Sequence, residues 1–455
     1  MAFSSFSFPP STPLFPPAAT VETYLCDYAS HFHLRPHIQF STSVEDVSYD
    51  GAKWVVVTAP TSPDGTVSHS LPRTYRFDLL FVCNGHYSVP RYPSTPGLEP
   101  WLLSRRASHS VFYRNPSISG APFSLGKSHK VLVIGGGPSG QDIVADLHGV
   151  VGCIVHSAST HLAVHQDQDE SEPALRLRGR PTHFLDMAGG KGKVEFEGGI
   201  VEDNIDYCII ATGYQVSFPF FKAPSMSRYL IDGLPPSLPL LPQELFNTTY
   251  GVFPLVRHTF PFPFSNSESM PPPSPTSLAF LGLLVRVAPF PLVEAQARAA
   301  LSAFSHPDRI DWTHESTDIM ERYRTLKGQL GLEDSAAEDK VSEAQIQKAW
   351  CRFEPMEQFD YRDLLADLVD ELDGTSPSHP DGSWMPVARS KSWERELYDH
   401  KDVLRRTWRA LEASGEAEDW VRGIGTGDHS EEEWVDLMWR VVRKGEGDEK
   451  SGEKA

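Results

Sequence analysis

Residues 131–142 read Val-Leu-Val-Ile-Gly-Gly-Gly-Pro-Ser-Gly-Gln-Asp, the strongest structural signal in this chain. Four apolar residues run directly into a Gly-x-Gly-x-x-Gly pattern, and an amphipathic segment follows. This order is typical of a buried parallel strand, a tight turn and a helix start. Gly135 allows the turn, Gly137 lets a pyrophosphate approach the backbone, and Gly140 lets the helix pack closely on the strand. The pattern predicts a dinucleotide-binding Rossmann-like unit; the alternative is a chance glycine turn.

The next apolar run, Val150 to Val155, is predicted to be the strand at whose end the adenine ribose is read. An acidic residue at this point binds the ribose 2′-hydroxyl of NAD. Here the sequence continues with His156 and Ser157 and has no carboxylate. A hydroxyl and an imidazole tolerate a 2′-phosphate, so NADP is favoured over NAD, although no Arg follows closely to pair with that phosphate.

Composition excludes several classes of function. The chain has 455 residues, 40% of them hydrophobic, and is long enough for two or more domains. Its net charge of −19 argues against a nucleic-acid partner. No apolar run reaches the roughly 18 residues of a transmembrane helix. The five cysteines are widely spaced and form no CxxC pair, so we expect a reducing, cytoplasmic location.

Two segments on either side of the glycine pattern resemble each other. Residues 74–86 and 205–214 each contain an Asp, a β-rich apolar run and a small-residue turn. Each is predicted to be a strand that ends in a glycine turn. In flavoproteins with two dinucleotide-binding domains, such pairs of strands connect the flavin-binding and nicotinamide-binding domains. Because the two segments flank the glycine pattern in this order, we favour that interpretation over ordinary core strands.

Several short motifs, in this order, resemble those of the flavin-containing monooxygenase family, of the soluble fungal type with N,N-dimethylaniline monooxygenase-like members. They are Phe6–Pro10 with Tyr24–Ala29, Val82–His86 with Pro90, Pro93 and Pro96-Gly97, His109-Ser110 with Tyr113, Ala211–Tyr214, and Leu278–Leu283 with Pro289–Pro291 and Glu294–Gln296. The likeness covers roughly residues 1–370, and the order of the motifs is more specific than any one of them.

The resemblance implies an α/β fold in which a Rossmann-like NADP-binding domain is inserted into an incomplete FAD/NAD(P)-binding domain, followed by a helical extension. We expect the first part of a FAD-type domain over 1–127 and the NADP-binding domain over 128–212. The second part of the FAD-type domain is expected over 213–330 and a helical, acidic C-terminal extension over 331–455.

Two features depart from the family pattern. The front half of the FxGxxxHSxxY signature is missing, since Leu103 and Arg105 occupy its aromatic and glycine positions. The printed sequence also contains one GxGxxG, at Gly135, whereas the family begins with another that cradles FAD. The expectation is an incomplete gene model or, as the alternative, a real product with a damaged domain in which the strand at Leu79–Val82 lacks a neighbour.

For an intact member, the resemblance implies that NADPH reduces FAD and that a flavin C4a-hydroperoxide transfers oxygen from O₂ to a small-molecule nucleophile, a soft nitrogen or sulfur. The alternative for this chain is an inactive NADP-binding remnant that acts as a binding or sensor protein. A disulfide reductase of the thioredoxin reductase kind is disfavoured, because it needs a CxxC pair.

No catalytic acid–base pair and no metal site are evident, and His86 and His109 are interpreted as structural. The expected cofactor-binding residues are those of the glycine turn, the ribose position and the family motifs: Gly135, Gly137, Pro138, Ser139, Gly140, Gln141, Ser157, Asn84, Gly85, Thr212, Gly213, Glu294 and Gln296.

Overall fold

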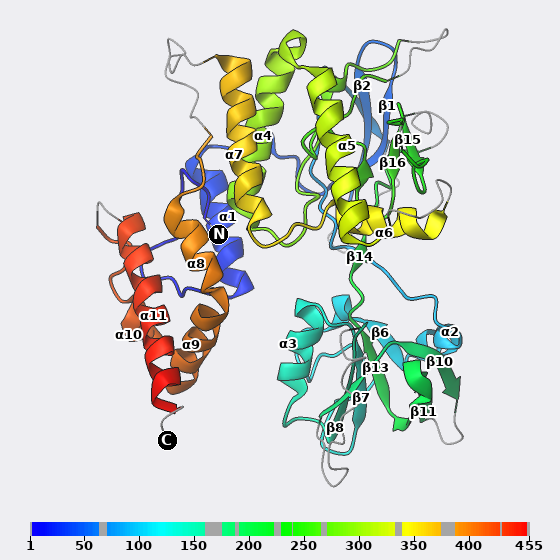
Figure 1. Ribbon diagram of the computed structural model, residues 1–455, viewed down its shortest axis with the longest axis vertical. Helices are drawn as coiled ribbons and strands as arrows, with labels where there is room; N and C mark the ends of the chain where they lie inside the picture. Colours follow the sequence, from blue (N-terminus) through cyan, green and yellow to red (C-terminus); the bar gives the residue numbers. More distant parts are fainter. Residues whose placement is uncertain are drawn as a thin grey trace. The chain divides into compact units, whose positions relative to one another are not determined.

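The computed structural model describes residues 2–62, 71–159, 175–186, 191–222, 229–238, 240–264, 271–332, 339–374, 387–427 and 430–452. The chain divides into two compact units. Unit 1 comprises 1–84 and 218–455, and unit 2 comprises 85–217, so unit 2 is inserted into unit 1. The fold is mixed α/β, with a parallel sheet and flanking helices (Figure 1).

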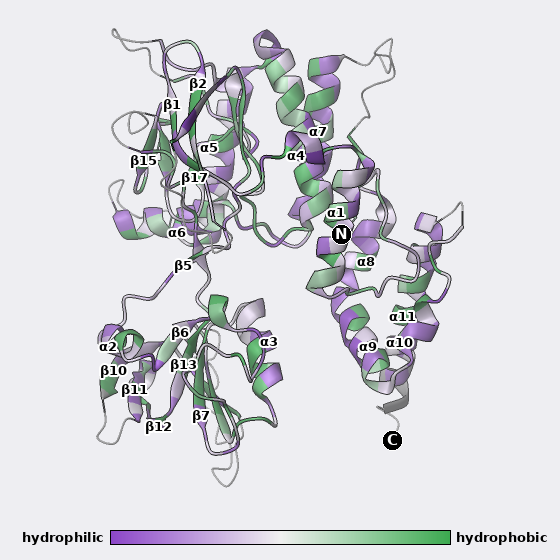
Figure 2. Cartoon of the chain, turned by 180° about the vertical axis from the view of Figure 1, so that it is seen from behind, coloured by the Kyte–Doolittle hydropathy of each residue, from purple (hydrophilic) through white to green (hydrophobic). Residues whose placement is uncertain are grey.

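Unit 2 is built on a five-stranded parallel sheet in the order β6-β13-β7-β8-β9. Its strands are β6 (Ala107–His109), β7 (Lys130–Ile134), β8 (Cys153–Ser157), β9 (Leu175–Arg178) and β13 (Tyr207–Ile210). Strands β7 and β13 are almost entirely apolar and buried, as expected for the centre of a sheet that is covered on both faces (Figure 2). The second strand of the nucleotide unit begins at Cys153, whereas the apolar run predicted a start at Val150, because 150–152 form a turn.

The remaining elements of unit 2 cover this sheet. Helix α3 (Pro138–Leu147) follows β7, and α2 (Leu98–Leu103) precedes β6. An antiparallel sheet has the order β10-β11-β12, and the short pair β5–β14 joins the two ends of the unit. Their bounds are β5 (Val89–Pro90), β10 (Pro181–Asp186), β11 (Gly192–Phe196), β12 (Val201–Ile205) and β14 (Tyr214–Gln215). Unit 2 starts at Gly85, upstream of the expected boundary at 128, because β6 joins the parallel sheet.

The described residues of unit 1 form three small sheets. An antiparallel sheet has the order β1-β2-β3, another group has the order β15-β16-β17, and β4 pairs in parallel with β18. The bounds are β1 (Thr42–Tyr49), β2 (Trp54–Pro60), β3 (Arg73–Phe77), β4 (Leu80–Val82), β15 (Leu230–Asp232), β16 (Leu245–Asn247), β17 (Val252–Phe253) and β18 (Leu278–Phe280). The single strand predicted over 74–86 is therefore wrong: its residues belong to β3 and β4, in two different sheets.

Helices form the rest of unit 1 (Figure 1). Their bounds are α1 (Ala18–His31), α4 (Pro289–Ser305), α5 (Trp312–Gln329), α6 (Lys340–Trp350), α7 (Glu357–Asp373), α8 (Ser392–Asp399), α9 (Lys401–Ser414), α10 (Ala417–Val421) and α11 (Ser430–Gly452). One apolar core joins side chains of α4, α5, α6 and α7, so the expected boundary at 331 falls inside a shared core. Helices α8 to α11 form a second core around Trp408. No helix of the described residues is long and apolar enough to cross a bilayer.

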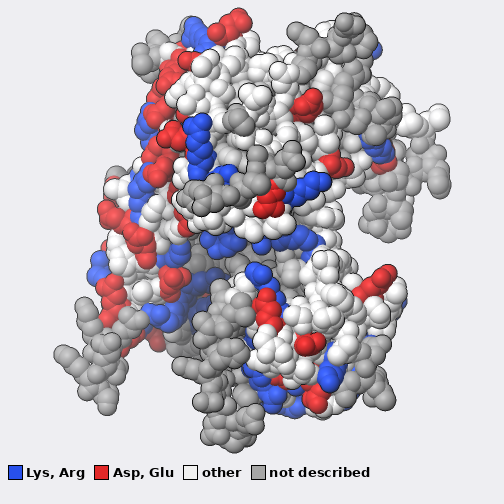
Figure 3. All heavy atoms as spheres, turned by 45° about the vertical axis from the view of Figure 1, so that its right-hand side comes forward, with Lys and Arg blue, Asp and Glu red and all other residues white. Residues whose placement is uncertain are grey.

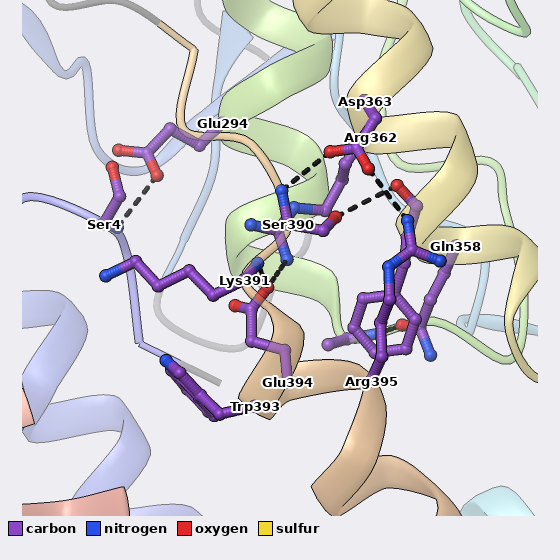
Figure 4. A network of polar contacts seen from close by, with 12 residues as sticks. Ser4, Glu294, Gln358, Arg362, Asp363, Ser390, Lys391, Trp393, Glu394 and Arg395 are labelled. Atoms are coloured by element: carbon purple, nitrogen blue, oxygen red, sulfur yellow. Dashed lines mark hydrogen bonds and ion pairs between the residues drawn. The ribbon is translucent and has the colours of Figure 1, made fainter. Parts of the chain in front are cut away.

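Polar contacts link α8 to α7 (Figure 4). Arg362 on α7 is almost buried and pairs with Glu394 at 2.9 Å. Arg395 bonds to Asp360 and Asp363, and the Ser390 amide donates to Asp363 at 2.7 Å. The helical extension is thus fixed to the rest of unit 1 by paired charges as well as by packing.

Candidate dinucleotide-binding site

The glycine turn between β7 and α3 is shaped by two different constraints. A side chain at Gly135, whose φ is +130°, would collide with the carbonyl oxygen of Ala211, and one at Gly140 would collide with that of Gly135. A Cβ at Gly137 would meet nothing within 4 Å. Two of the glycines are therefore required by close packing, and the third leaves open space in front of the helix.

The N-terminus of α3 faces this open space. Gly137 is the N-cap residue, no side chain caps the helix, and Pro138 and Ser139 open its first turn and are exposed. The amide groups of a first helical turn lack partners within the helix, and the helix dipole favours an anion there. Gln141 donates a side-chain hydrogen bond to the Gly136 carbonyl at 3.2 Å, which steadies the turn. The geometry fits a dinucleotide pyrophosphate.

The ribose end of the site lies beside β9. The Ser157 hydroxyl is buried and donates to the Gly179 carbonyl at 2.7 Å, and the His156 ring bonds to the Gly135 carbonyl at 2.9 Å. Arg178 is the register partner of Ser157 in the adjacent strand. The fold thus places the backbone of Arg178 beside the expected 2′-phosphate position, while its guanidinium donates to Glu202 and to the Leu177 carbonyl. Residues 160–174 separate the two strands, so the spacing in the sequence did not predict the pairing of Ser157 with Arg178.

Arg178 is held by a buried carboxylate. Glu202 on β12 accepts from Arg178 at 2.5 and 2.9 Å, and also pairs with Lys130 and Arg176. Burial raises the pKa of Glu202, but the hydrogen bonds and charges of Lys130 and Arg178 outweigh burial and hold the pKa below its ordinary value. The cluster ties β7, β9 and β12 together.

The turn after β13 lies beside the glycine turn, since β13 and β7 are neighbouring parallel strands. Gly213 has φ +84°. The Thr212 hydroxyl donates to the Arg91 carbonyl at 2.5 Å, and the Arg91 guanidinium donates to the Thr212 carbonyl at 2.8 Å. The His109 ring is buried, and its Nε2 lies 2.9 Å from the Gly213 carbonyl oxygen, while Nδ1 accepts from the Val111 amide.

These contacts define the state of His109. With Nδ1 accepting, Nε2 carries the proton and donates to Gly213. Burial, opposed by the Gly213 hydrogen bond and assisted by the charge of Arg91, lowers the pKa of His109. His109 is therefore a neutral side chain that stabilises the turn at Gly213.

The expected site residues of unit 1 gather at the ends of β4 and β18. Asn84 follows β4, and Gly282 follows β18, at the same edge because the strands are parallel. The buried Gln296 accepts from the Gly282 amide and donates to the Tyr361 hydroxyl, each at 3.0 Å. Burial raises the pKa of Tyr361 to about 12. Gln296 thus fixes the position of the Gly282 turn through its hydrogen bond with the Gly282 amide.

Glu294 and Gly85 stand apart from this group. A Glu294 oxygen accepts from the Ser4 amide at 2.9 Å, so this carboxylate holds the N-terminal segment (Figure 4). Gly85 opens unit 2 with φ +71°, and a Cβ there would meet nothing within 4 Å. The expected set therefore separates by unit: Asn84, Glu294 and Gln296 belong to unit 1, and the others belong to unit 2.

Comparison with known proteins agrees with this architecture. Residues 1–167 match the model of the family "Flavin-binding monooxygenase-like". An Arabidopsis thaliana protein named flavin-containing monooxygenase FMO GS-OX-like 9 is 32% identical over 329 residues, which are 69% of this chain and 60% of that protein. The chain belongs to the flavin-containing monooxygenase family.

A further sequence relative and a solved structure support the same family and fold. The thiol-specific monooxygenase of Saccharomyces cerevisiae is 31% identical over 245 residues, 51% of this chain and 50% of that protein. The solved S-allyl-L-cysteine S-oxygenase from Allium sativum has the same fold, with a TM-score of 0.62 and 20% identity over 97% of this chain and 82% of that one. The chain spans 50 to 60% of the length of these two curated relatives.

Members of this family use FAD and NADPH. The turn at Gly135 fits one dinucleotide, because it combines an open Gly137 with an uncapped helix start. Among the described residues, we find no second glycine-rich turn of this kind between a parallel strand and a helix. The described residues thus fit the pyrophosphate of NADPH and do not supply a separate cradle for that of FAD.

Proposed function

We propose that this chain binds NADPH at the Gly135 turn and serves FAD-dependent monooxygenation of a small molecule that carries a soft nucleophilic sulfur or nitrogen. The observation that carries the proposal is the turn itself, with two glycines required by packing and one open toward the helix N-terminus. Membership of the family supplies the reaction class. The name of the yeast relative, a thiol-specific monooxygenase, favours sulfur.

The residues of the chain perform binding and positioning in this proposal. The α3 N-terminus and Gly137 hold the pyrophosphate, and Arg178, at the end of β9, is the register partner of Ser157 at the expected 2′-phosphate position. His109, Thr212 and Arg91 fix the turn beside it. When bound, FAD would supply the oxygen-activating chemistry. Its pyrophosphate finds no cradle in the described residues.

The test is a pair of measurements on the purified 455-residue chain. Titration with NADPH and NADH should show tighter binding of NADPH, since the sequence at the end of β8, His156-Ser157, has no carboxylate. Oxygenation of a thiol and of a thioether should then be assayed with and without added FAD. Equal affinity for NADH and NADPH would contradict the cofactor assignment, and absence of turnover with bound FAD and NADPH would contradict the reaction.

The second candidate is an NADP-binding protein without oxygenase activity, which acts as a sensor or partner. One observation favours it: the described residues contain one dinucleotide cradle. NADPH binding without FAD binding in the same preparation would support this candidate. For either function we propose a cytoplasmic location, because all five cysteines are free.

A further inference from the structure

Two arginines of unit 1 approach each other beyond the carboxyl end of β18. The chain leaves β18, turns at Gly282 and reaches Val285, which forms an isolated parallel bridge with Arg352. The Val285 amide donates to the Cys351 carbonyl at 2.9 Å, and the Phe353 amide donates to the Val285 carbonyl at 3.3 Å. Arg286 follows directly, so this bridge brings Arg286 and Arg352 together.

Neither guanidinium forms an ion pair with an acidic side chain of the described residues. Both side chains are exposed, and within the described ranges neither takes part in an ion pair or a side-chain hydrogen bond. Other arginines of unit 1, such as Arg257 and Arg322, are paired with carboxylates. The chain has 60 acidic against 41 basic side chains, so two adjacent exposed cations that form no ion pair within the described ranges are unexpected.

The charges and the backbone conformation both make the Arg286–Arg352 pair energetically unfavourable when no anion is bound. Burial and the charge of Arg286 lower the pKa of the Arg352 guanidinium, against the opposing effect of Glu354. Arg286 also has φ +66°, a left-handed conformation that disfavours a side chain. Backbone strain of this kind is concentrated at binding sites, where the surrounding structure maintains it. An anion placed between the two guanidinium groups would relieve their repulsion.

The location favours a ligand role. In open parallel sheets, ligands bind beyond the carboxyl ends of the strands. Arg286 lies four residues after Gly282 (286 − 282), in the segment that begins at the carboxyl end of β18. The pyrophosphate site at Gly135 belongs to unit 2, and these two cations belong to unit 1.

We propose that Arg286 and Arg352 form an oxyanion subsite that binds the carboxylate of a sulfur-containing substrate. This inference rests on the proposed function and specifies its substrate class as anionic thiols or thioethers. Guanidinium groups bind carboxylates through paired N–H donors, which gives orientation as well as affinity. A phosphate of the dinucleotide is the other source of the same chemistry, and the experiment separates the two.

The test compares two probes that differ only in charge: 3-(methylthio)propanoate and its neutral amide, 3-(methylthio)propanamide. Calorimetric titration of the full chain at low salt should show the acid binding at least about tenfold more tightly than the amide, with the ratio falling as salt is added. In Arg286→Gln and in Arg352→Gln this ratio should fall toward one.

Arg324→Gln is the matched control, because Arg324 is exposed on α5 and has no ion pair among the described residues. It should leave the ratio unchanged. Far-UV circular dichroism and urea unfolding of each variant show whether it is folded. Arg352→Lys, which keeps the charge but loses the fork, should retain part of the preference.

Three results would overturn the subsite. One is absence of detectable acid binding, or an acid-to-amide ratio near one, in the unsubstituted chain. Another is an unchanged ratio in both glutamine variants. The third is a loss of NADPH affinity in these variants with the ratio intact, which would assign the pair to a cofactor phosphate. Binding needs no turnover, so a failure of oxygenation would count against the proposed function and leave the subsite standing.

Discussion

At the scale of single residues, the three glycines of the turn have separate duties. Gly135 and Gly140 are constrained by backbone atoms that a Cβ would meet, whereas Gly137 borders open space. A substitution at Gly137 therefore tests binding with little disturbance of the fold, and substitutions at the other two would test packing.

We expect Gly137→Asp to weaken NADPH binding by at least about tenfold. The new carboxylate would occupy the space in front of the α3 N-terminus and repel the pyrophosphate. Gly126→Asp is the control, since a Cβ at Gly126 also meets nothing within 4 Å and the residue lies outside the glycine turn. Fluorescence titration of both variants with NADPH checks the prediction, and equal affinities in the two would contradict it.

His109 should make stability depend on pH. Its folded-state pKa is lowered, so the unfolded chain binds more protons below the ordinary histidine pKa of about 6.5. The free energy of unfolding is therefore expected to fall as pH decreases from 7.5 to 5.5. His109→Gln should reduce this slope, and replacement of the exposed His148 by Gln should leave it unchanged. Urea unfolding at each pH measures the slopes; identical slopes in all three proteins would refute the role of His109.

The sequence predicted the glycine turn well because the strand, the three glycines and the helix start all lie within residues 131–142. It did not predict that the Ser157 hydroxyl would be buried against Gly179, or that Arg178 would lie beside it. These relations depend on the pairing of β8 with β9, which no local pattern encodes. The Arg286–Arg352 contact is of the same kind, since it depends on a bridge between distant segments.

At the scale of secondary-structure elements, the largest difference concerns residues 74–86. One predicted strand is divided into β3, which is mostly exposed and pairs with β2, and β4, which pairs with β18. The expectation that Leu79–Val82 would lack a neighbour is wrong on one side, because β18 supplies a parallel partner. That partner lies about 200 residues further along the chain, so a local sequence pattern cannot predict the pairing.

We expect Glu202→Ala to destabilise unit 2 by about 3–5 kcal/mol, because it leaves Lys130, Arg176 and Arg178 without their shared carboxylate. The matched control is Glu195→Ala on β11, where the carboxylate is 40% exposed and the expected change is within about 0.5 kcal/mol. Denaturant unfolding compares the two variants. A Glu202→Ala protein as stable as the Glu195→Ala protein would show that the cluster adds nothing to stability.

At the scale of the whole molecule, side chains of both charges are exposed together on one face. Acidic and basic side chains both occupy the face shown in Figure 3, although the net charge is −19. The helical character of the last third follows from its periodicity, but its division does not: α6 and α7 share a core with α4, while Trp408 anchors a separate cluster of α8 to α11. Periodicity identifies the apolar face of each helix but does not show which other helix that face packs against.

The last prediction concerns flavin. The described residues provide one pyrophosphate cradle, at Gly135, and the remaining family motifs in unit 1 are engaged in internal contacts, Gln296 with Tyr361 and Glu294 with Ser4. Dinucleotide affinity depends on several preorganised contacts, of which those to the charged pyrophosphate are central. We therefore expect the 455-residue chain to bind NADPH but to purify without stoichiometric FAD and, unless FAD is added, without NADPH-dependent oxygenation. An absorption spectrum in the flavin bands decides this, with NADPH titration of the same sample as the control for folding. A stoichiometric flavin peak would show that contacts elsewhere in the chain are sufficient to hold FAD.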